Sequence, residues 1–318
     1  MADVVARLDE FDPDLLLPEH FFCIFYGLRR SGKTVMLRFL LSEMENRLCE
    51  HKVYLFSSTA EVSPEQYDFV PSKAKFPNIS ELEFDLGEIV GKQKAAIKEF
   101  HEEKGPEPEP ILIILDDCVS ENIVRHSPSL NALAVSGRHI NMSVVILSQV
   151  VTGSGSVPPI IRTQADTIFV VANPRSEVER KLIAEQYLTA ENTYGGKQKG
   201  LSVLGAATST QYRALVITTT DSSARRYIEY LYTYGPVPEH VELKLGTEEQ
   251  WAESQETPIQ KRKVQKRKKE QPPSSSLPNP FQLTPALPTD SSGEFLNGLS
   301  ESLASNNRGA SNRRGRRR

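Results

Sequence analysis

Cysteine is scarce in this sequence, and long apolar runs are missing. The three cysteines, Cys23, Cys49 and Cys118, are scattered without the spacing of a metal site, and an odd, sparse set is typical of a reducing compartment. No apolar run reaches the roughly 18 residues that a membrane helix needs. The acidic start MADVVARLDEFDPD also lacks the pattern of a signal peptide. We therefore expect an intracellular, soluble protein with no disulfide framework.

Apolar residues are few as well, and charged residues are unevenly distributed. Hydrophobic residues make up 38% of the 318 residues, which is low for a chain that is packed throughout. Residues 260–318 contain 13 basic and 4 acidic side chains, a net charge of +9, which leaves −12 for residues 1–259. A basic segment of this kind indicates an anionic partner. The acidic remainder argues against a broadly basic DNA-binding surface.

Strands and helices alternate through the first 220 residues. Apolar runs predict strands at residues 21–26, 53–56, 111–115, 144–147, 167–171 and 214–218, and helical patterns fall at 34–47, 86–102 and 176–187. This order predicts an α/β domain with a mostly parallel sheet and helices on both faces. From residue 246 onward Pro, Ser and charged residues dominate. We expect one domain over residues 1–245 and a disordered basic tail over residues 246–318.

The strongest motif follows the first predicted strand. The apolar FFCIFY leads into Gly27-x-x-x-x-Gly32-Lys33-Thr34, and a helical stretch begins at Thr34, which is the context that identifies a phosphate-binding P-loop. The two glycines let the backbone curl around a triphosphate and point its N–H groups inward. Lys33 would reach the β- and γ-phosphates, and Thr34 would bind Mg²⁺. The residues expected to bind the nucleoside triphosphate are Gly27, Arg30, Ser31, Gly32, Lys33 and Thr34.

A second motif ends in two carboxylates. ILIILDDC is a buried strand that finishes at Asp116 and Asp117, the Walker B pattern. Adjacent carboxylates at a strand end are unfavourable unless a cation and water occupy the site. We expect Asp116 to hold Mg²⁺ together with Thr34, and Asp117 to orient or deprotonate the attacking water.

A third motif, SGRHINMSVVILSQ, contains a strand that ends in Gln149. ATPases of the ASCE or RecA-like class have an extra strand between the P-loop and Walker B strands, and a polar residue at its tip contacts the γ-phosphate or the water. We expect Gln149 to be this sensor. The predicted fold is therefore an α/β P-loop NTPase of that class.

Taken in order, GLRRSGKT, ILIILDDC and GRHINMSVVILSQ resemble the poxvirus-type viral genome-packaging ATPases of the FtsK–HerA superfamily. The resemblance covers roughly residues 15–220 and includes Arg138-His139 before the third strand. It departs from the common family pattern at Leu28-Arg29-Arg30, where small residues are usual. It implies an ATP-hydrolysing motor that assembles as a homo-oligomeric ring and moves double-stranded DNA into a capsid, with capsid or portal proteins as partners.

In such rings, an arginine of one subunit completes the catalytic site of its neighbour. Arg138 has the best positional argument for this role because it lies between the Walker B motif and the sensor strand. Arg175 and Arg162 are further candidates.

Three other classes of function share parts of this pattern. A small GTPase is excluded because the chain has no Asn/Thr-Lys-x-Asp segment, and because the residues at the Walker B position, Asp116-Asp117-Cys118-Val119, lack the glycine of an Asp-x-x-Gly switch. A nucleoside or nucleotide kinase of the P-loop class would use Lys33 and Asp116 similarly, and Arg162, Arg175 and Arg180 could belong to its lid. A scaffold protein that only binds nucleotide would tolerate loss of Asp117. The kinase and the scaffold both remain open.

The basic tail has more than one interpretation. KRKVQKRKK at Lys261–Lys269 matches a nuclear localisation segment, and it would equally bind DNA phosphates through counterion release. A tail that only improves solubility is the third interpretation. A nuclear import receptor is thus a candidate partner, and we expect the protein in the host nucleus or at a cytoplasmic assembly site, with association with the virion as a further expectation.

Overall fold

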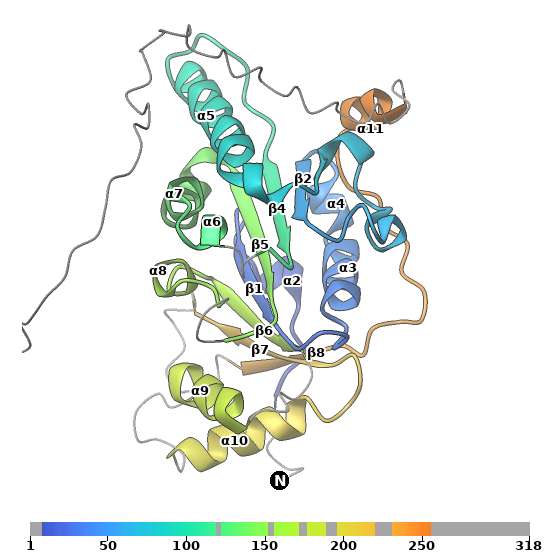
Figure 1. Ribbon diagram of the computed structural model, residues 1–318, viewed down its shortest axis with the longest axis vertical. Coiled ribbons are helices and arrows are strands. Elements are labelled where there is room, and N and C mark those ends of the chain that lie inside the picture. The colour runs from blue at the N-terminus through green and yellow to red at the C-terminus, as the bar shows by residue number, and fades with distance from the viewer. Residues whose placement is uncertain are drawn as a thin grey trace, which may run out of the picture. The chain divides into compact units, whose positions relative to one another are not determined.

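The computed structural model describes residues 8–118, 122–151, 156–171, 177–188, 196–219 and 231–255, which lie within the compact unit Met1–Lys261. These residues form an eight-stranded sheet in the order β3-β2-β4-β5-β1-β6-β7-β8 (Figure 1). The strands are β1 (Phe22–Tyr26), β2 (Lys52–Ser57), β3 (Lys75–Phe76), β4 (Ile111–Asp116), β5 (Met142–Ser148), β6 (Thr167–Val171), β7 (Ala214–Thr218) and β8 (Leu231–Tyr234).

Most of the sheet is parallel, as the sequence predicted. The pairings among β3, β2, β4, β5, β1 and β6 are all parallel, whereas β7 and β8 continue the sheet in antiparallel fashion. Every residue of β1, β4, β5 and β6 is buried. Strands covered on both faces read as continuous apolar runs, and this is why they were visible in the sequence.

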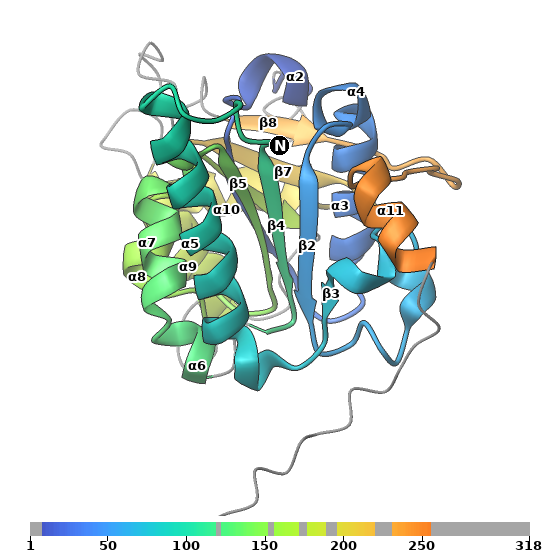
Figure 2. The same cartoon turned by 90° about the horizontal axis from the view of Figure 1, so that it is seen from above.

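Helices cover both faces of the sheet. Figure 2 shows α5, α7 and α9 on one face and α3, α4 and α11 on the other. The α-helices are α2 (Pro13–Leu16), α3 (Lys33–Glu43), α4 (Glu45–Leu48), α5 (Leu82–His101), α6 (Asn122–Arg125), α7 (Pro128–Ser136), α8 (Pro159–Arg162), α9 (Glu177–Tyr187), α10 (Gly196–Ala207) and α11 (Glu248–Gln255). The short 3₁₀ turns are η1 (Pro64–Tyr67), η2 (Ser72–Ala74), η3 (Ile79–Glu81) and η4 (Gly137–Ile140).

Alternate residues of the central strand supply the two halves of the core. Phe22, Ile24 and Tyr26 of β1 belong to the apolar cluster that includes residues of α5, α7 and α9. Cys23 and Phe25 point to the opposite cluster, which includes α3 and α4. The two-residue period of a strand produces this division. No described helix combines the length and the apolar character needed to cross a membrane.

The described fold continues past the expected boundary at residue 245. The Leu245 N–H donates to the Phe69 carbonyl (2.9 Å), and α11 follows. The side-chain amide of Gln250 pairs with the backbone of Val53, donating to its carbonyl and accepting from its N–H, both at 3.0 Å. The Trp251 indole N–H donates to the Leu245 carbonyl (2.8 Å).

Residues 246–255 were expected in the tail but form part of the domain, to which Gln250 and Trp251 are hydrogen-bonded. The sequence did not predict this helix because its residues are mostly polar. A helix attached by hydrogen bonds has no apolar stripe that a sequence pattern would reveal. Residues 256–318, which include the proposed nuclear localisation segment, lie outside the described residues.

Candidate functional site

The ends of three neighbouring parallel strands bring the predicted motifs together. Strand β5 lies between β1 and β4, which confirms the extra strand expected between the P-loop and Walker B strands. Tyr26 pairs with Ser148 at the end of β1, and Asp116 pairs with Leu147 at the end of β4. The P-loop, the paired aspartates and Gln149 therefore share the carboxyl edge of the sheet, where ligands bind in open α/β folds.

The P-loop backbone needs its glycines. A Cβ on Gly27 would lie 2.4 Å from Ser31 Oγ and 2.8 Å from the Val171 carbonyl oxygen. Gly32 has φ +92° and is the N-cap of α3, so it supplies no side chain to occupy the first-turn N–H groups. Among the described residues, nothing hydrogen-bonds the buried Ser31 hydroxyl. The N–H groups of a first helical turn, together with a hydroxyl that has no partner among the described residues, fit a phosphate.

Lys33 lies folded over this loop. Its ammonium group donates to the carbonyls of Gly27 (2.8 Å) and Leu28 (3.2 Å). Burial holds the pKa of Lys33 below its usual value, although the carboxylates of Asp117 and Asp116 raise it. A buried cation beside the N-terminus of a helix is suited to hold an anion.

Asp116 is the buried carboxylate of the site, with 3% of its surface exposed. Its Oδ2 accepts from the Thr34 hydroxyl (3.1 Å) and from the Tyr67 hydroxyl (2.8 Å). Burial raises the pKa of Asp116, the Tyr67 hydrogen bond lowers it, the neighbouring Asp117 raises it, and Lys33 and Thr34 lower it. Mg²⁺ that binds together with phosphates needs only one or two protein ligands, so Thr34 and Asp116 fit such a site. Among the described residues there is no cluster of three or more metal-binding side chains.

Asp117 and Gln149 form the other half of the site. The Gln149 amide donates to Asp117 Oδ1 (2.5 Å), so the tip of β5 holds the second Walker B carboxylate. Asp117 has φ +56°, a conformation that costs energy in a residue with a side chain. The structure thus brings together all the residues predicted at this edge.

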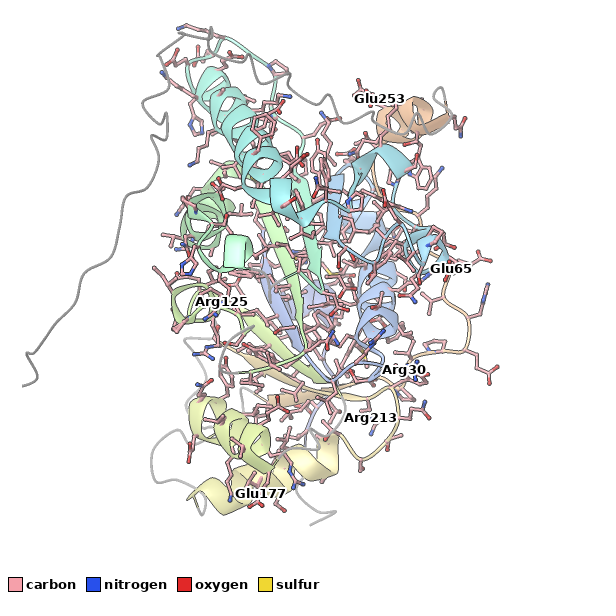
Figure 3. The ribbon with its side chains drawn as sticks, viewed as in Figure 1. Arg30, Glu65, Arg125, Glu177, Arg213 and Glu253 are labelled. Carbon is pink, nitrogen blue, oxygen red and sulfur yellow. The ribbon has the colours of Figure 1, made fainter. Side chains whose placement is uncertain are left out.

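Arg30, which was predicted to bind nucleotide, also has a positive φ, +63°. Figure 3 labels Arg30 on the P-loop, and it labels Arg213 directly before β7.

The arginines proposed to act on a neighbouring subunit lie elsewhere. Arg138 is exposed in η4, before the start of β5 and so at the edge opposite the P-loop. It lines a small pocket of about 30 Å³ with His20 and Asp166. The Arg162 guanidinium donates to the Val151 carbonyl (2.8 Å), an internal contact. Arg175 lies outside the described residues.

Sequence reasoning missed two tyrosines at the site. Tyr67 in η1 donates to Asp116 as described above, and a Cβ on Gly32 would lie 2.8 Å from the ring of Tyr212. Tyr212 has φ +56° and lies in the loop before β7. Both residues come from connecting segments with no periodic pattern. For Tyr67, the sequence offered one indication: Ser57 and Thr59 are polar residues at and just after the end of β2, where they contact its hydroxyl.

Comparison with known proteins gives one family and a set of matching solved structures. The family model described as Poxvirus A32 protein matches residues 8–245, and the curated proteins give no match.

Three of the matching solved structures are given with their identities and coverage. The genome packaging NTPase B204 from Sulfolobus turreted icosahedral virus 2, in complex with ATP-gammaS, is 16% identical over 70% of this chain and 100% of that one, with a TM-score of 0.43. The pCW3 conjugation coupling protein TcpA is 12% identical over 64% and 59%, with a TM-score of 0.47. EssC (ATPases 2 and 3) from Geobacillus thermodenitrificans is 17% identical over 76% and 44%, with a TM-score of 0.46.

Proposed function

The chain belongs to the poxvirus A32 protein family, and from this premise we propose that it is an ATP-hydrolysing motor that translocates double-stranded DNA to package a viral genome into a capsid. The observation that carries the proposal is the assembly of Lys33, the Thr34–Asp116 pair and the Asp117–Gln149 pair at one edge of the sheet. This set combines phosphate binding with a carboxylate suited to activate water.

Nucleotide binding falls to the P-loop. Its glycine-containing backbone offers N–H groups, the Ser31 hydroxyl has no partner within the described residues, and Lys33 adds a positive charge. Thr34 and Asp116 are the residues that would hold Mg²⁺, because their side chains are already hydrogen-bonded to each other. Bound Mg-ATP supplies the phosphoanhydride bond that is cleaved and the cation that offsets its charge.

Hydrolysis requires a water molecule to be oriented for attack. Asp117 is the proposed orienting or basic residue, and Gln149 limits its movement through the amide hydrogen bond. A carboxylate held by a neutral donor keeps its ability to accept a proton from water. Gln149 thereby links the tip of β5 to the proposed catalytic group, in keeping with the sensor role expected from the sequence.

In a ring, the exposed Arg138 would act on the catalytic site of a neighbouring subunit. It lies at the edge of the sheet opposite the P-loop of its own chain, so it would have to act on the site of a neighbouring subunit. Capsid or portal proteins are the partners that packaging requires.

For residues 261–269 we propose binding to DNA or to a nuclear import receptor, on the strength of their charge alone. The corresponding locations are the host nucleus, a cytoplasmic assembly site and the virion.

ATP turnover, titrated with double-stranded DNA, tests the proposed function. We expect hydrolysis without any phosphoryl acceptor, stimulation by DNA, and no turnover by Lys33→Ala. Asp117→Asn preserves an oxygen for the Gln149 amide and should retain nucleotide binding while hydrolysis falls about 100-fold or more.

Two results would contradict the proposal. Phosphoryl transfer to a nucleoside instead of water would identify a kinase. Hydrolysis by Asp117→Asn at the rate of the unmodified chain would remove the catalytic role of that carboxylate.

A further inference from the structure

Tyr67 extends the candidate metal site to a segment that no motif covers. We infer that Tyr67 is a positioning residue, whose hydroxyl holds the Asp116 carboxylate in the orientation that Asp116 and Thr34 need to hold Mg²⁺. The inference rests on the proposed function and deepens it. It assigns a role to residues 57–67, which contain no nucleotide-binding motif.

The hydrogen bonds around Tyr67 have a defined direction. The Tyr67 side chain is 1% exposed, and its hydroxyl donates to Asp116 Oδ2 at 2.8 Å. A phenol has one proton to donate, so its oxygen acts as the acceptor for the Ser57 hydroxyl at 3.3 Å. The Thr59 hydroxyl lies 3.0 Å from the same oxygen and 2.9 Å from Ser57 Oγ, so its single proton is shared between these two acceptors.

This arrangement does more than satisfy a buried hydroxyl. The Tyr67 hydroxyl has two neutral neighbours, Ser57 and Thr59, that would serve as acceptors, yet its proton is directed to the carboxylate. Hydrogen bonds to a charged acceptor are stronger than neutral ones, and donors in series strengthen one another. Thr34 donates to the same oxygen, Oδ2. Two fixed donors on one oxygen leave Oδ1 as the less occupied atom of the carboxylate.

Tyr67 is positioned independently of both motifs that it serves. It belongs to η1, which follows β2, whereas Thr34 lies in the first turn of α3 and Asp116 ends β4. The Phe69 carbonyl, two residues further on, accepts from the Leu245 N–H at 2.9 Å. A hydroxyl fixed by a third part of the fold prevents the carboxylate from turning when the P-loop changes its contacts.

Equilibrium binding of a fluorescent ATP analogue, measured with Mg²⁺ and with EDTA, tests the inference. The readout is the factor by which Mg²⁺ increases affinity. We expect Tyr67→Phe to reduce this factor about tenfold, the size of a lost hydrogen bond to a charged group, with little change in EDTA. Tyr54→Phe, which removes a hydroxyl from β2 outside this network, should leave the factor unchanged.

Two further variants separate positioning from general support of the fold. Thr59→Val keeps Tyr67 but removes one donor to its oxygen, and should reduce the Mg²⁺ factor about two- to threefold; this variant also decides the matter if Tyr67→Phe does not fold. In an Asp116→Asn background, Tyr67→Phe should have no additional effect, because Tyr67 acts through that carboxylate.

The outcomes are distinguishable. An unchanged Mg²⁺ factor in Tyr67→Phe, or an equal loss of affinity with Mg²⁺ and with EDTA, overturns the inference and leaves the proposed function standing. If the unmodified chain shows no gain in affinity from Mg²⁺, the proposed function fails, and the role of Tyr67 fails with it.

Discussion

At the scale of single residues, the candidate site depends on buried groups whose charges compensate one another. Lys33 and Asp116 are both buried, and each shifts the pKa of the other toward the charged form. The sequence predicted these residues because the P-loop and Walker B patterns are local. Tyr67 and Tyr212 could not be predicted, because a loop residue reaches a site through the path of the chain in space, which no spacing encodes.

The burial of His51 should make the stability of the protein depend on pH. His51 precedes β2 with 7% of its surface exposed, and within the described part of the chain neither ring nitrogen has a hydrogen-bond partner. Burial, assisted by His20 and Arg47, lowers the pKa of His51 to about 4, whereas an unfolded histidine has a pKa of about 6.5. Between these values the unfolded chain binds the proton more readily. The free energy of unfolding should therefore decrease as pH falls through this window.

Urea unfolding at pH 7.5 and pH 5 measures this effect. His51→Leu removes the titrating group. Between pH 7.5 and pH 5, the free energy of unfolding of this variant should decrease by about 2 kcal/mol less than that of the unmodified chain. Equal losses in the two proteins would show that His51 titrates normally in the folded state.

At the scale of elements, the buried strands were the most predictable part of the fold. Strands β6 and β7 begin and end at the predicted residues, and β1 and β4 differ from the prediction by one residue. The two-residue β3 was missed because so short a run carries no pattern. Helix α10 begins at Gly196 with the sequence GKQKG, a poor helix former. Its packing against α9 and β7 overrides that propensity.

Two glycines in helical contexts give opposite predictions. Gly32 has φ +92°, and a Cβ at this position would lie 2.8 Å from the Tyr212 ring. Gly32→Ala should therefore destabilise the protein by about 1–2 kcal/mol and weaken nucleotide binding at least about tenfold. Gly91 lies within α5, and a Cβ at this position would meet nothing within 4 Å. Gly91→Ala should stabilise the protein by about 0.5–1 kcal/mol and leave nucleotide binding unchanged.

Chemical unfolding and binding of an ATP analogue, applied to both variants, check this pair. The contrast fails if Gly32→Ala binds nucleotide as well as Gly91→Ala does.

At the scale of the whole chain, an acidic portion is joined to a basic one. Residues 1–259 carry a net charge of −12 and residues 260–318 carry +9. The expected boundary at residue 245 would remove α11 together with the tail, so truncation there mixes two effects. A chain that ends at Gln255 keeps α11 and loses the basic residues.

Truncated chains separate these effects. Residues 1–255 should unfold at the same temperature as the full chain, but bind DNA more weakly and with a flatter salt dependence. Residues 1–245 should unfold about 5 °C lower, since the Gln250 and Trp251 hydrogen bonds are lost. Thermal unfolding and DNA titrations over a range of salt concentrations provide the measurements. Equal unfolding temperatures for the two truncated chains would assign α11 no part in stability, and DNA binding by residues 1–255 equal to that of the full chain would assign none to the tail.

The contact between Gln250 and Val53 has a consequence for self-association. Strand β3 covers β2 only at Leu55 and Phe56, and the Gln250 amide satisfies the backbone N–H and carbonyl of Val53. Without α11, these two groups would lie open on an apolar strand, as a template for a strand of another molecule. A protein that ends where the family match ends, at residue 245, should therefore be prone to aggregate through β2. In the longer chain, α11 covers the backbone groups of Val53 and blocks that strand pairing.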